Sequence, residues 1–450
     1  MKSTLYTLFA LSIGSTVAAQ SNPAITAWLQ NTTQTARHYV SGNSTPINDA
    51  DLVNVQSVKY SSNYVYVTTT GLPSYVTGPF LDGNPSLATN QNAIFKVPLN
   101  PVANTGSLVA TTGGNIGIFI NGVALFDYRD GVAWNNSTNA LCGGPGNPPC
   151  PGGPTATQNW NRDAVLAERG GFDCSKAHPA MGNYHHHQNP SAFKLDKVVL
   201  SSICNLYNAD GLYAIDSTKH SPLIGFAYDG FPIYGAYAYK NANGTGPIVR
   251  MKSSYTLTSA TTRNLGPAVS TTYPLGYFRE DYVYSPTSAS TPDYLDQHNG
   301  RFCVTPEYPN GIYCYFATVD ANWNSAYPYV VGPTFYGTIV TSKVTSITET
   351  VNTYVPLSTG IAGLDVEKST INVYPNPSSD LVVVQIADIT RGDVSVELLD
   401  AAGKVVDKTS VLQGSTIAYF DTKTLYAGMY FIRISSGDKS TVKKVLVEKE

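Results

Sequence analysis

The amino-acid sequence predicts an all-β protein, in which a large β-rich central domain is followed by a small C-terminal β-sandwich. Three observations support this fold class. Across residues 20–340 no apolar pattern of helical period persists, whereas short runs typical of strands recur. The chain contains 31 Tyr, 38 Gly and 28 Pro residues, and these residue types favour strands and turns. After residue 366, apolar and polar residues alternate in several short segments, as they do in half-buried strands.

The composition describes a chain that can bury a large core and carries little net charge. Of its 450 residues, 42% are hydrophobic and only 13% are charged. The 28 Lys+Arg residues against 31 Asp+Glu residues give a formal net charge of −3. Because nucleic-acid binding relies on clustered Lys and Arg to neutralise phosphates, this balance argues against a nucleic acid as partner.

Residues 1–19 predict a signal peptide. Lys2 precedes a mostly apolar stretch from Leu5 to Ile13, and the small residues of Val17–Ala19 precede Gln20. Signal peptidase accepts small residues at these positions, so we expect cleavage after Ala19. No other apolar run reaches the roughly 18 residues that span a bilayer, and we expect no membrane span.

Strand patterns recur through the central region, and its clearest hairpin joins Ile116–Ile120 to Val123–Phe126 through Asn121-Gly122. The dipeptide Asn-Gly supplies the two positive-φ residues of a type I′ turn. Residues 131–160 are rich in Gly, Pro and Asn and predict a long surface loop. Further strands are expected at Ser57–Tyr60, Tyr64–Thr70 and Ala93–Val97.

Six cysteines in an exported chain predict three disulfide bonds. A zinc site is the rival interpretation, but no C-x2-C spacing occurs in the chain. Proximity along the chain is the only guide to the pairing. The expected pairs are Cys142–Cys150, Cys303–Cys314 and the remaining Cys174–Cys204.

Four of the seven His residues lie between positions 178 and 187. The dipeptide Gly182-Asn183 is typical of a turn, so a strand is expected to follow it. Alternate side chains share a face of a strand, so His185 and His187 point the same way and the turn can bring His178 over them. Three neutral imidazoles suit a transition metal such as zinc or copper. The alternative is a solvated His run, or imidazoles that bond backbone carbonyls.

The opposite face of the same strand carries Tyr184 and His186, which are candidate catalytic residues for acid–base chemistry. Asp229 and His298 are candidates for additional site residues. Asp229 precedes a glycine between two apolar runs, where its side chain can equally cap the turn. A structural role for His298 is the competing interpretation.

The central region resembles the YHYH domain family, which is named for a Tyr-His-Tyr-His motif. The resemblance is carried by Gly182–His187 with His178-Pro179 before it, and by the run Asp229–Gly235. In this chain His186 stands where the motif has its second Tyr. The resemblance implies that residues 20–340 form a YHYH-type domain.

The C-terminal segment, residues 366–450, predicts a small β-sandwich, with a hairpin turn at residues 400–404. It resembles the type A C-terminal sorting domain of the type IX secretion system, through Val373–Pro377, Val396–Val406 and Leu425–Tyr430. This resemblance implies transport through the periplasm, the type IX machinery as partner, and release or attachment at the outer-membrane surface. Residues 341–365, rich in Ser, Thr and Val, predict a linker or a last strand followed by a tether. The strands expected in the sandwich are Leu381–Ile386, Val394–Leu399, Gly428–Ile434 and Lys443–Val447.

Three functions are compatible with these features. The first is an exported protein that binds a transition metal through its His cluster. The second is a carbohydrate-active enzyme, a lyase or hydrolase, that uses Tyr and His as acid and base on a polysaccharide. The third is a surface adhesion or interaction protein without catalysis. Metal content separates the first from the third, and formation of double bonds in uronate polysaccharides tests the second.

Overall fold

The computed structural model describes residues 22–449, apart from residues 32, 82–86, 154–157, 193–203, 205, 208–209, 287–290, 341, 356–369, 387–393, 412–415 and 437–438. The predicted signal peptide therefore lies outside the described residues. Within them the chain is all-β, as predicted, and its α-helices are the short α1 (Pro23–Thr26) and α2 (Ala164–Glu168). None of the described helices is long and apolar enough to cross a membrane.

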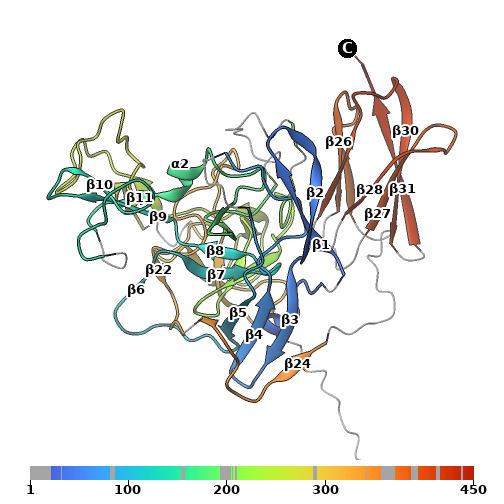
Figure 1. Ribbon diagram of the computed structural model, residues 1–450. Helices are drawn as coiled ribbons and strands as arrows, with labels where there is room; N and C mark the ends of the chain where they lie inside the picture. The colour runs from blue at the N-terminus through green and yellow to red at the C-terminus, as the bar shows by residue number, and fades with distance from the viewer. Residues whose placement is uncertain are drawn as a thin grey trace, which may run out of the picture.

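The largest sheet of the described chain lies at the centre of the molecule (Figure 1) and has eight strands. Most neighbours in it are antiparallel, but β13 pairs with β8 and β15 pairs with β21 in parallel. In spatial order the strands are β12 (His178–Ala180), β13 (Asn183–His186), β8 (Ala124–Phe126), β7 (Asn115–Phe119), β14 (Leu223–Ala227), β15 (Pro232–Tyr234), β21 (Ile312–Phe316) and β20 (Gly300–Cys303).

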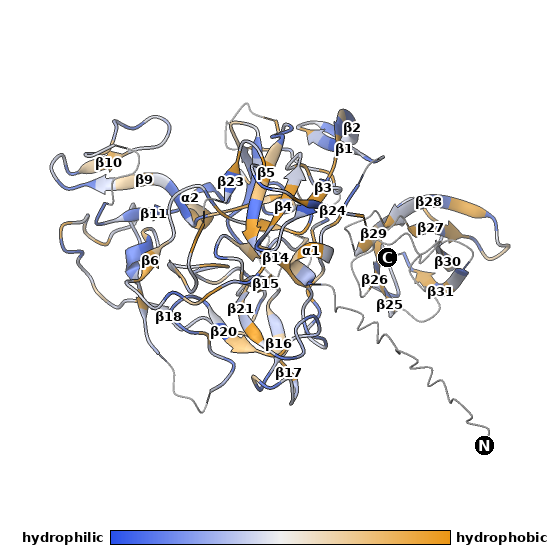
Figure 2. Ribbon diagram, turned by 90° about the horizontal axis from the view of Figure 1, so that it is seen from below, coloured by the Kyte–Doolittle hydropathy of each residue, from blue (hydrophilic) through white to orange (hydrophobic). Residues whose placement is uncertain are grey.

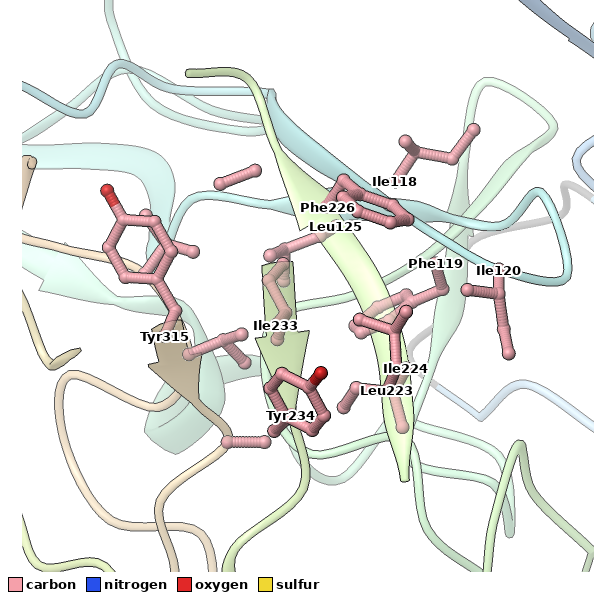
Figure 3. Packing of buried hydrophobic residues seen from close by; sticks show 14 of the residues in the cluster. Ile118, Phe119, Ile120, Leu125, Leu223, Ile224, Phe226, Ile233, Tyr234 and Tyr315 are labelled. Atoms are coloured by element: carbon pink, nitrogen blue, oxygen red, sulfur yellow. The ribbon is translucent and has the colours of Figure 1, made fainter. Parts of the chain in front are cut away.

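The main hydrophobic core surrounds the middle of this sheet (Figure 3). All five residues of β14 are buried, and the unbroken apolar run that encodes it is typical of a strand covered on both faces. Ile118, Phe226 and Ile233 pack there with no exposed surface. Burial of each such side chain contributes about 1.5–3 kcal/mol, so the middle of the sheet is the rigid part from which its edges extend.

A second sheet of five strands packs beside the first. Its inner strands match the predicted ones closely, and its two outer strands come from residues 343–354, before the undescribed stretch 356–369. These outer strands show that the chain continues as paired structure past residue 340. The order is β23 (Lys343–Val344), β5 (Ala93–Pro98), β4 (Tyr64–Thr69), β3 (Val55–Tyr60) and β24 (Asn352–Tyr354).

The predicted hairpin at residues 116–126 is present as β7 and β8, but its turn is not type I′. Gly122 has a φ of +82°, whereas Asn121 is not among the residues with positive φ. The Gly122 N–H donates to the Phe119 carbonyl at 2.8 Å, so a turn ends on one left-handed glycine, as in a three-residue hairpin loop. A Cβ on Gly122 would lie 2.1 Å from Thr69 Oγ1, which explains why this position is glycine.

Residues 131–160, predicted as a loop, contain paired strands. β9 (Arg129–Asn135) lies between β10 (Ala140–Cys142) and β11 (Asn161–Asp163). These strands project to one side of the central sheets beside α2 (Figure 1). The remaining described elements are the two-stranded sheets β1 (Thr35–Val40)/β2 (Asn43–Leu52), β16 (Tyr237–Tyr239)/β17 (Ile248–Arg250), β18 (Tyr255–Leu257)/β19 (Tyr282–Tyr284) and β22 (Thr334–Phe335)/β6 (Val109–Ala110), with η3 (Arg279–Asp281).

The C-terminal strands form the predicted β-sandwich and lie apart from the central sheets (Figure 2). They enclose a core of their own, with Val384, Val396 and Ile432 fully buried. A small apolar contact, which includes Ala214 and Val383, joins the sandwich to the central region. One sheet is β25 (Ile371–Tyr374), β26 (Leu381–Ile386) and β29 (Ile417–Asp421), and the other is β28 (Val405–Val411), β27 (Val394–Leu399), β30 (Gly428–Ser436) and β31 (Lys439–Val447).

Two of the three predicted disulfides are present, Cys142–Cys150 and Cys174–Cys204, but the predicted Cys303–Cys314 bond is wrong. Cys303 faces Ile312 across the strand pair, and Cys314 faces Arg301. The two cysteines are therefore diagonal neighbours, whose Cα atoms are typically about 7–8 Å apart. A disulfide requires Cα atoms within about 7 Å, so this register holds two buried thiols side by side without a bond.

Alkylation is expected to find two free thiols in the intact protein. Because Cys303 and Cys314 are both buried, N-ethylmaleimide should label them only after unfolding in denaturant without reductant. Mass spectrometry of the peptides should then find the label on these two residues and on none of the other four cysteines. Full resistance to labelling in denaturant would contradict the register described here.

Candidate metal site

A tight hairpin between β12 and β13 builds the His cluster. Its two-residue loop is Met181-Gly182, with φ values of +50° and +82°, which is the geometry of a type I′ turn. The Gly182 carbonyl accepts a hydrogen bond from Thr89 N at 2.8 Å, and a Cβ on Gly182 would lie 2.1 Å from Thr89 Oγ1. The turn is thus fixed both by its own backbone and by the neighbouring segment.

The strand register brings three imidazoles together. His178 is the cross-strand partner of His185, and His187 lies two residues further along on the same face. One nitrogen from each ring lies within 4.8 Å of the other two, and all three residues are buried. The structure therefore gathers the three residues that the sequence pattern grouped, His178, His185 and His187.

Backbone carbonyls orient two of the rings. His185 Nδ1 lies 2.8 Å from the Asn183 carbonyl and His187 Nδ1 lies 2.5 Å from the Asp127 carbonyl. A carbonyl can only accept, so each Nδ1 carries a proton, and the Nε2 atom of each ring is the one left for a further proton or a metal ion. These two Nε2 atoms are 3.1 Å apart. Two lone pairs repel at that distance, so the arrangement requires a proton or a metal ion between them.

The His cluster is buried, and aromatic rings pack against it. The Phe126 ring stacks on His185 with centroids 3.7 Å apart, and Phe172 meets His178 edge-on at 5.0 Å. Burial, with His187 and His178 as further causes, lowers the pKa of His185 well below its ordinary value. His185 is therefore neutral at physiological pH, which is the state that binds a metal.

Glu168, which the sequence analysis did not select, lies against the same cluster. Its Oε2 atom is 3.2 Å from His178 Nε2 and 3.3 Å from His187 Nε2. Burial raises the pKa of Glu168, but the two imidazoles outweigh burial and hold that pKa below its usual range. The carboxylate is therefore ionised. One feature of the sequence could have drawn attention to Glu168. It is the only Glu among the first 279 residues of the chain, which include the whole His cluster.

The short helix α2 positions Glu168. Asp163 caps its N-terminus, because the Asp163 side chain accepts from Leu166 N at 3.1 Å. The other carboxylate oxygen of Asp163 accepts from the Tyr329 hydroxyl at 2.9 Å. These contacts anchor the start of the helix in the core, so that its last residue, Glu168, reaches the His cluster.

Tyr184 and His186 lie on the opposite face of β13, fully buried. The Tyr184 hydroxyl donates to Asp173 Oδ2 at 2.8 Å, and His186 Nε2 is 2.8 Å from the Tyr75 hydroxyl. Burial is the main cause that lowers the pKa of His186 to about 3 and raises that of Tyr184 well above its ordinary value. Both groups are neutral and engaged inside the protein, and their catalytic roles stay a hypothesis.

Asp229 and His298 are held by other partners. Asp229 Oδ2 accepts from the Tyr315 hydroxyl at 2.5 Å and from Gly337 N at 2.8 Å. The Thr334 hydroxyl lies 2.7 Å from His298 Nδ1. No described contact joins either residue to the His cluster, so the structure does not assemble them with the three imidazoles.

The buried carboxyl of Asp229 predicts a pH dependence of stability. Burial raises its pKa to about 6 against the opposing effect of its hydrogen bonds, whereas an unfolded Asp titrates near ~3.9. Between these values the folded state holds the proton and the unfolded state does not, so the stability from Asp229 falls as pH rises from about 4 to about 6. Two pKa units correspond to about 3 kcal/mol.

Urea unfolding of the wild type and of Asp229→Asn at several pH values tests this dependence. The difference between the two free energies of unfolding should change by up to about 3 kcal/mol from pH 4 to pH 7, with the wild type losing stability relative to the variant. Taking the difference cancels the other titrating groups. A difference that is constant across this range would contradict the assignment.

Two segments of the chain match known protein families. Residues 372–448 match the secretion system C-terminal sorting domain, so the chain is an exported protein that is secreted or attached to the cell surface through the type IX system. Residues 94–328, more than half of the chain, match the family described as YHYH protein. The chain belongs to the YHYH protein family. No curated protein matches it.

Proposed function

We propose that this exported YHYH protein binds a transition metal, zinc or copper, through His178, His185 and His187. The observation that carries the proposal is the pair of Nε2 atoms of His185 and His187, which lie 3.1 Å apart while each Nδ1 faces a backbone carbonyl. A metal ion replaces the repulsion between the two lone pairs by two bonds. Hydrogen bonding of the distal ring nitrogen to a carbonyl is also how metal-bound His is usually oriented.

The spacing supports a small four-coordinate ion. At Zn–N distances of about 2.0–2.1 Å, two ligands of a tetrahedral ion lie about 3.3 Å apart. The Nε2 atoms of His185 and His187 are close to this separation before any ion is added. Three neutral imidazoles suit zinc, copper and related divalent metals. When bound, such an ion supplies a Lewis acid with a position left for a further ligand.

Metal analysis of the purified protein tests the proposal. After equilibration with Zn²⁺ or Cu²⁺ and removal of excess metal, the wild type should retain about one ion per chain. His185→Ala should lose most of it, because one of three imidazoles is missing. His186→Asn is the matched control, since His186 is the next residue on the other face of the same strand.

The metal content of the two variants shows which face of the strand binds the ion. Equal loss of metal in His186→Asn and His185→Ala would mean that the assigned face is wrong. A wild type that retains no metal above the background of a protein without such a cluster would overturn the proposal. In that case a proton lies between the Nε2 atoms of His185 and His187.

Fewer observations support the two alternative functions. A carbohydrate-active enzyme would need Tyr184 or His186 within reach of a substrate, and both side chains are fully buried. A surface adhesion protein without chemistry is compatible with export and low charge, and it gives no reason for a dry cluster of three imidazoles and a carboxylate. We therefore retain the metal-binding function as the conclusion.

A further inference from the structure

We propose that Glu168 is a fourth ligand of this site, so that the ion is held by three imidazoles and one carboxylate. This inference rests on the proposed metal-binding function and extends it. It concerns the composition of the ligand set, which decides the charge of the site and where an exogenous molecule can reach the ion.

Geometry is the first support. Glu168 Oε2 lies 3.2 Å from His178 Nε2 and 3.3 Å from His187 Nε2. Both distances match the edge of about 3.3 Å expected between two ligands of a tetrahedral zinc ion. The third measured edge, between His185 and His187, is 3.1 Å. The Glu168 oxygen therefore lies at the spacing of a neighbouring ligand from two of the three imidazoles of the His cluster.

The second support is the burial of the Glu168 Oε2 atom. Glu168 Oε2 is buried, and its described contacts are those with His178 and His187 of the cluster. A buried carboxylate oxygen costs several kcal/mol of desolvation unless it is paired, so this atom needs a positive charge or a metal ion beside it. The carboxylate of Asp130 lies in the same region, but it is paired with Arg162. Glu168 is thus the carboxylate whose described contacts are with the His cluster itself.

Charge is the third support. A divalent ion held by three neutral imidazoles would place two positive charges in a buried pocket of aromatic rings. One carboxylate offsets half of that charge, which lowers the cost of burial. Oxygen and nitrogen donors together also favour zinc or divalent copper over soft monovalent copper, which prefers sulfur ligands.

Exposure indicates which ligand can be replaced. The Glu168 side chain is 24% exposed, whereas those of His178 and His187 are 6% and 3% exposed. Of these three side chains that of Glu168 lies nearest to solvent, although its Oε2 atom is itself buried. A small anion that binds the ion would take the place of this carboxylate, and removal of the side chain should open that position.

Cobalt substitution tests the ligand. Co²⁺ added to the wild-type protein should give the strong visible absorption of a four-coordinate ion, and acetate or azide should change it little. In Glu168→Ala the spectrum should shift, and acetate or azide should shift it again by filling the open position. Zinc affinity, measured by competition with a chromogenic chelator, should fall at least about tenfold, since even indirect partners of metal ligands contribute that much.

Two further variants test whether the effect is specific to the Glu168 carboxylate. Glu280→Gln removes a carboxylate of similar exposure, 22% against 24%, and should change neither spectrum nor affinity. Should Glu168→Ala fail to fold by circular dichroism, Glu168→Gln, which keeps the size of the side chain, carries the same comparison. A wild type that binds no Co²⁺ would refute the metal site itself. Binding with an unchanged spectrum and affinity in the Glu168 variants would leave the triad in place and overturn the fourth ligand.

Discussion

A chain that ends at residue 365 is expected to fold but to remain in the periplasm, whereas the full chain is delivered to the outside of the cell. The C-terminal sandwich carries the sorting signal and encloses its own core, centred on residues such as Val384 and Ile432. The truncation keeps β24, the last strand of the central sheets. It removes only a small apolar contact with the central region, so the central domain should stay soluble.

Cell fractionation of a secreting host measures this effect. Nearly all of the truncated chain should be recovered from the periplasm, and the full-length chain from the surface or the medium. Val442→Thr in the full-length chain is a suitable control, because Val442 lies outside the segments that carry the sorting-domain resemblance, is 51% exposed, and its replacement should leave the sandwich folded. Delivery of the truncated chain at the wild-type level would show that the sorting domain is dispensable here.

Replacing Asp173 by alanine is expected to lower the free energy of unfolding by about 3–5 kcal/mol. The buried carboxylate accepts four hydrogen bonds, which connect the segment before the His hairpin to distant parts of the fold. Each of these bonds contributes about 1 kcal/mol net to stability. The donors are Gly78 N at 2.9 Å, Tyr184 Oη at 2.8 Å, Ser175 N at 2.9 Å and Ala177 N at 3.2 Å.

Two milder variants calibrate the prediction by denaturant unfolding. Tyr184→Phe removes one of the four bonds and should cost about 1 kcal/mol. Asp173→Asn keeps an acceptor oxygen for the Ser175 and Ala177 amides and should fall between the other two. If Asp173→Ala were no less stable than Tyr184→Phe, the carboxylate would not be the structural centre of this region.

The sequence predicted the elements whose signals are local. The apolar run Leu223–Ala227 and the alternating residues of Val394–Leu399 form strands where expected, because burial on two faces or on one face leaves a distinct pattern. The turn at Asn121-Gly122 shows the limit of such signals. The dipeptide favours type I′, but only Gly122 of the pair has a positive φ, and the hairpin has a three-residue loop instead.

The cysteine pairs show a similar limit. Cys303 and Cys314 are close along the chain, yet the register of β20 with β21 places them diagonally, and a shift of register cannot be read from spacing. Long-range contacts such as this depend on the whole sheet rather than on neighbouring residues.

Within the site, the three imidazoles could be predicted and their surroundings could not. His178, His185 and His187 share one hairpin, so turn and strand alternation suffice to bring them together. Glu168 reaches the cluster from a helix of five residues, and the Asp127 carbonyl reaches it from the end of a neighbouring strand. Nothing in the periodicity around either residue indicates that contact.

The parallel pairing of β13 with β8 has a consequence for the order of events in folding. The hairpin that holds the three imidazoles is local and can form within microseconds. The bond that orients His187, to the carbonyl of Asp127, spans 60 residues, and non-local parallel pairing forms slowly. Under the proposed metal-binding function, an ion would meet the hairpin before its surroundings are complete, and it would be held fully only after β8 pairs with β13. Ion affinity would thus rise in two kinetic phases, the second at the rate at which the central sheet closes.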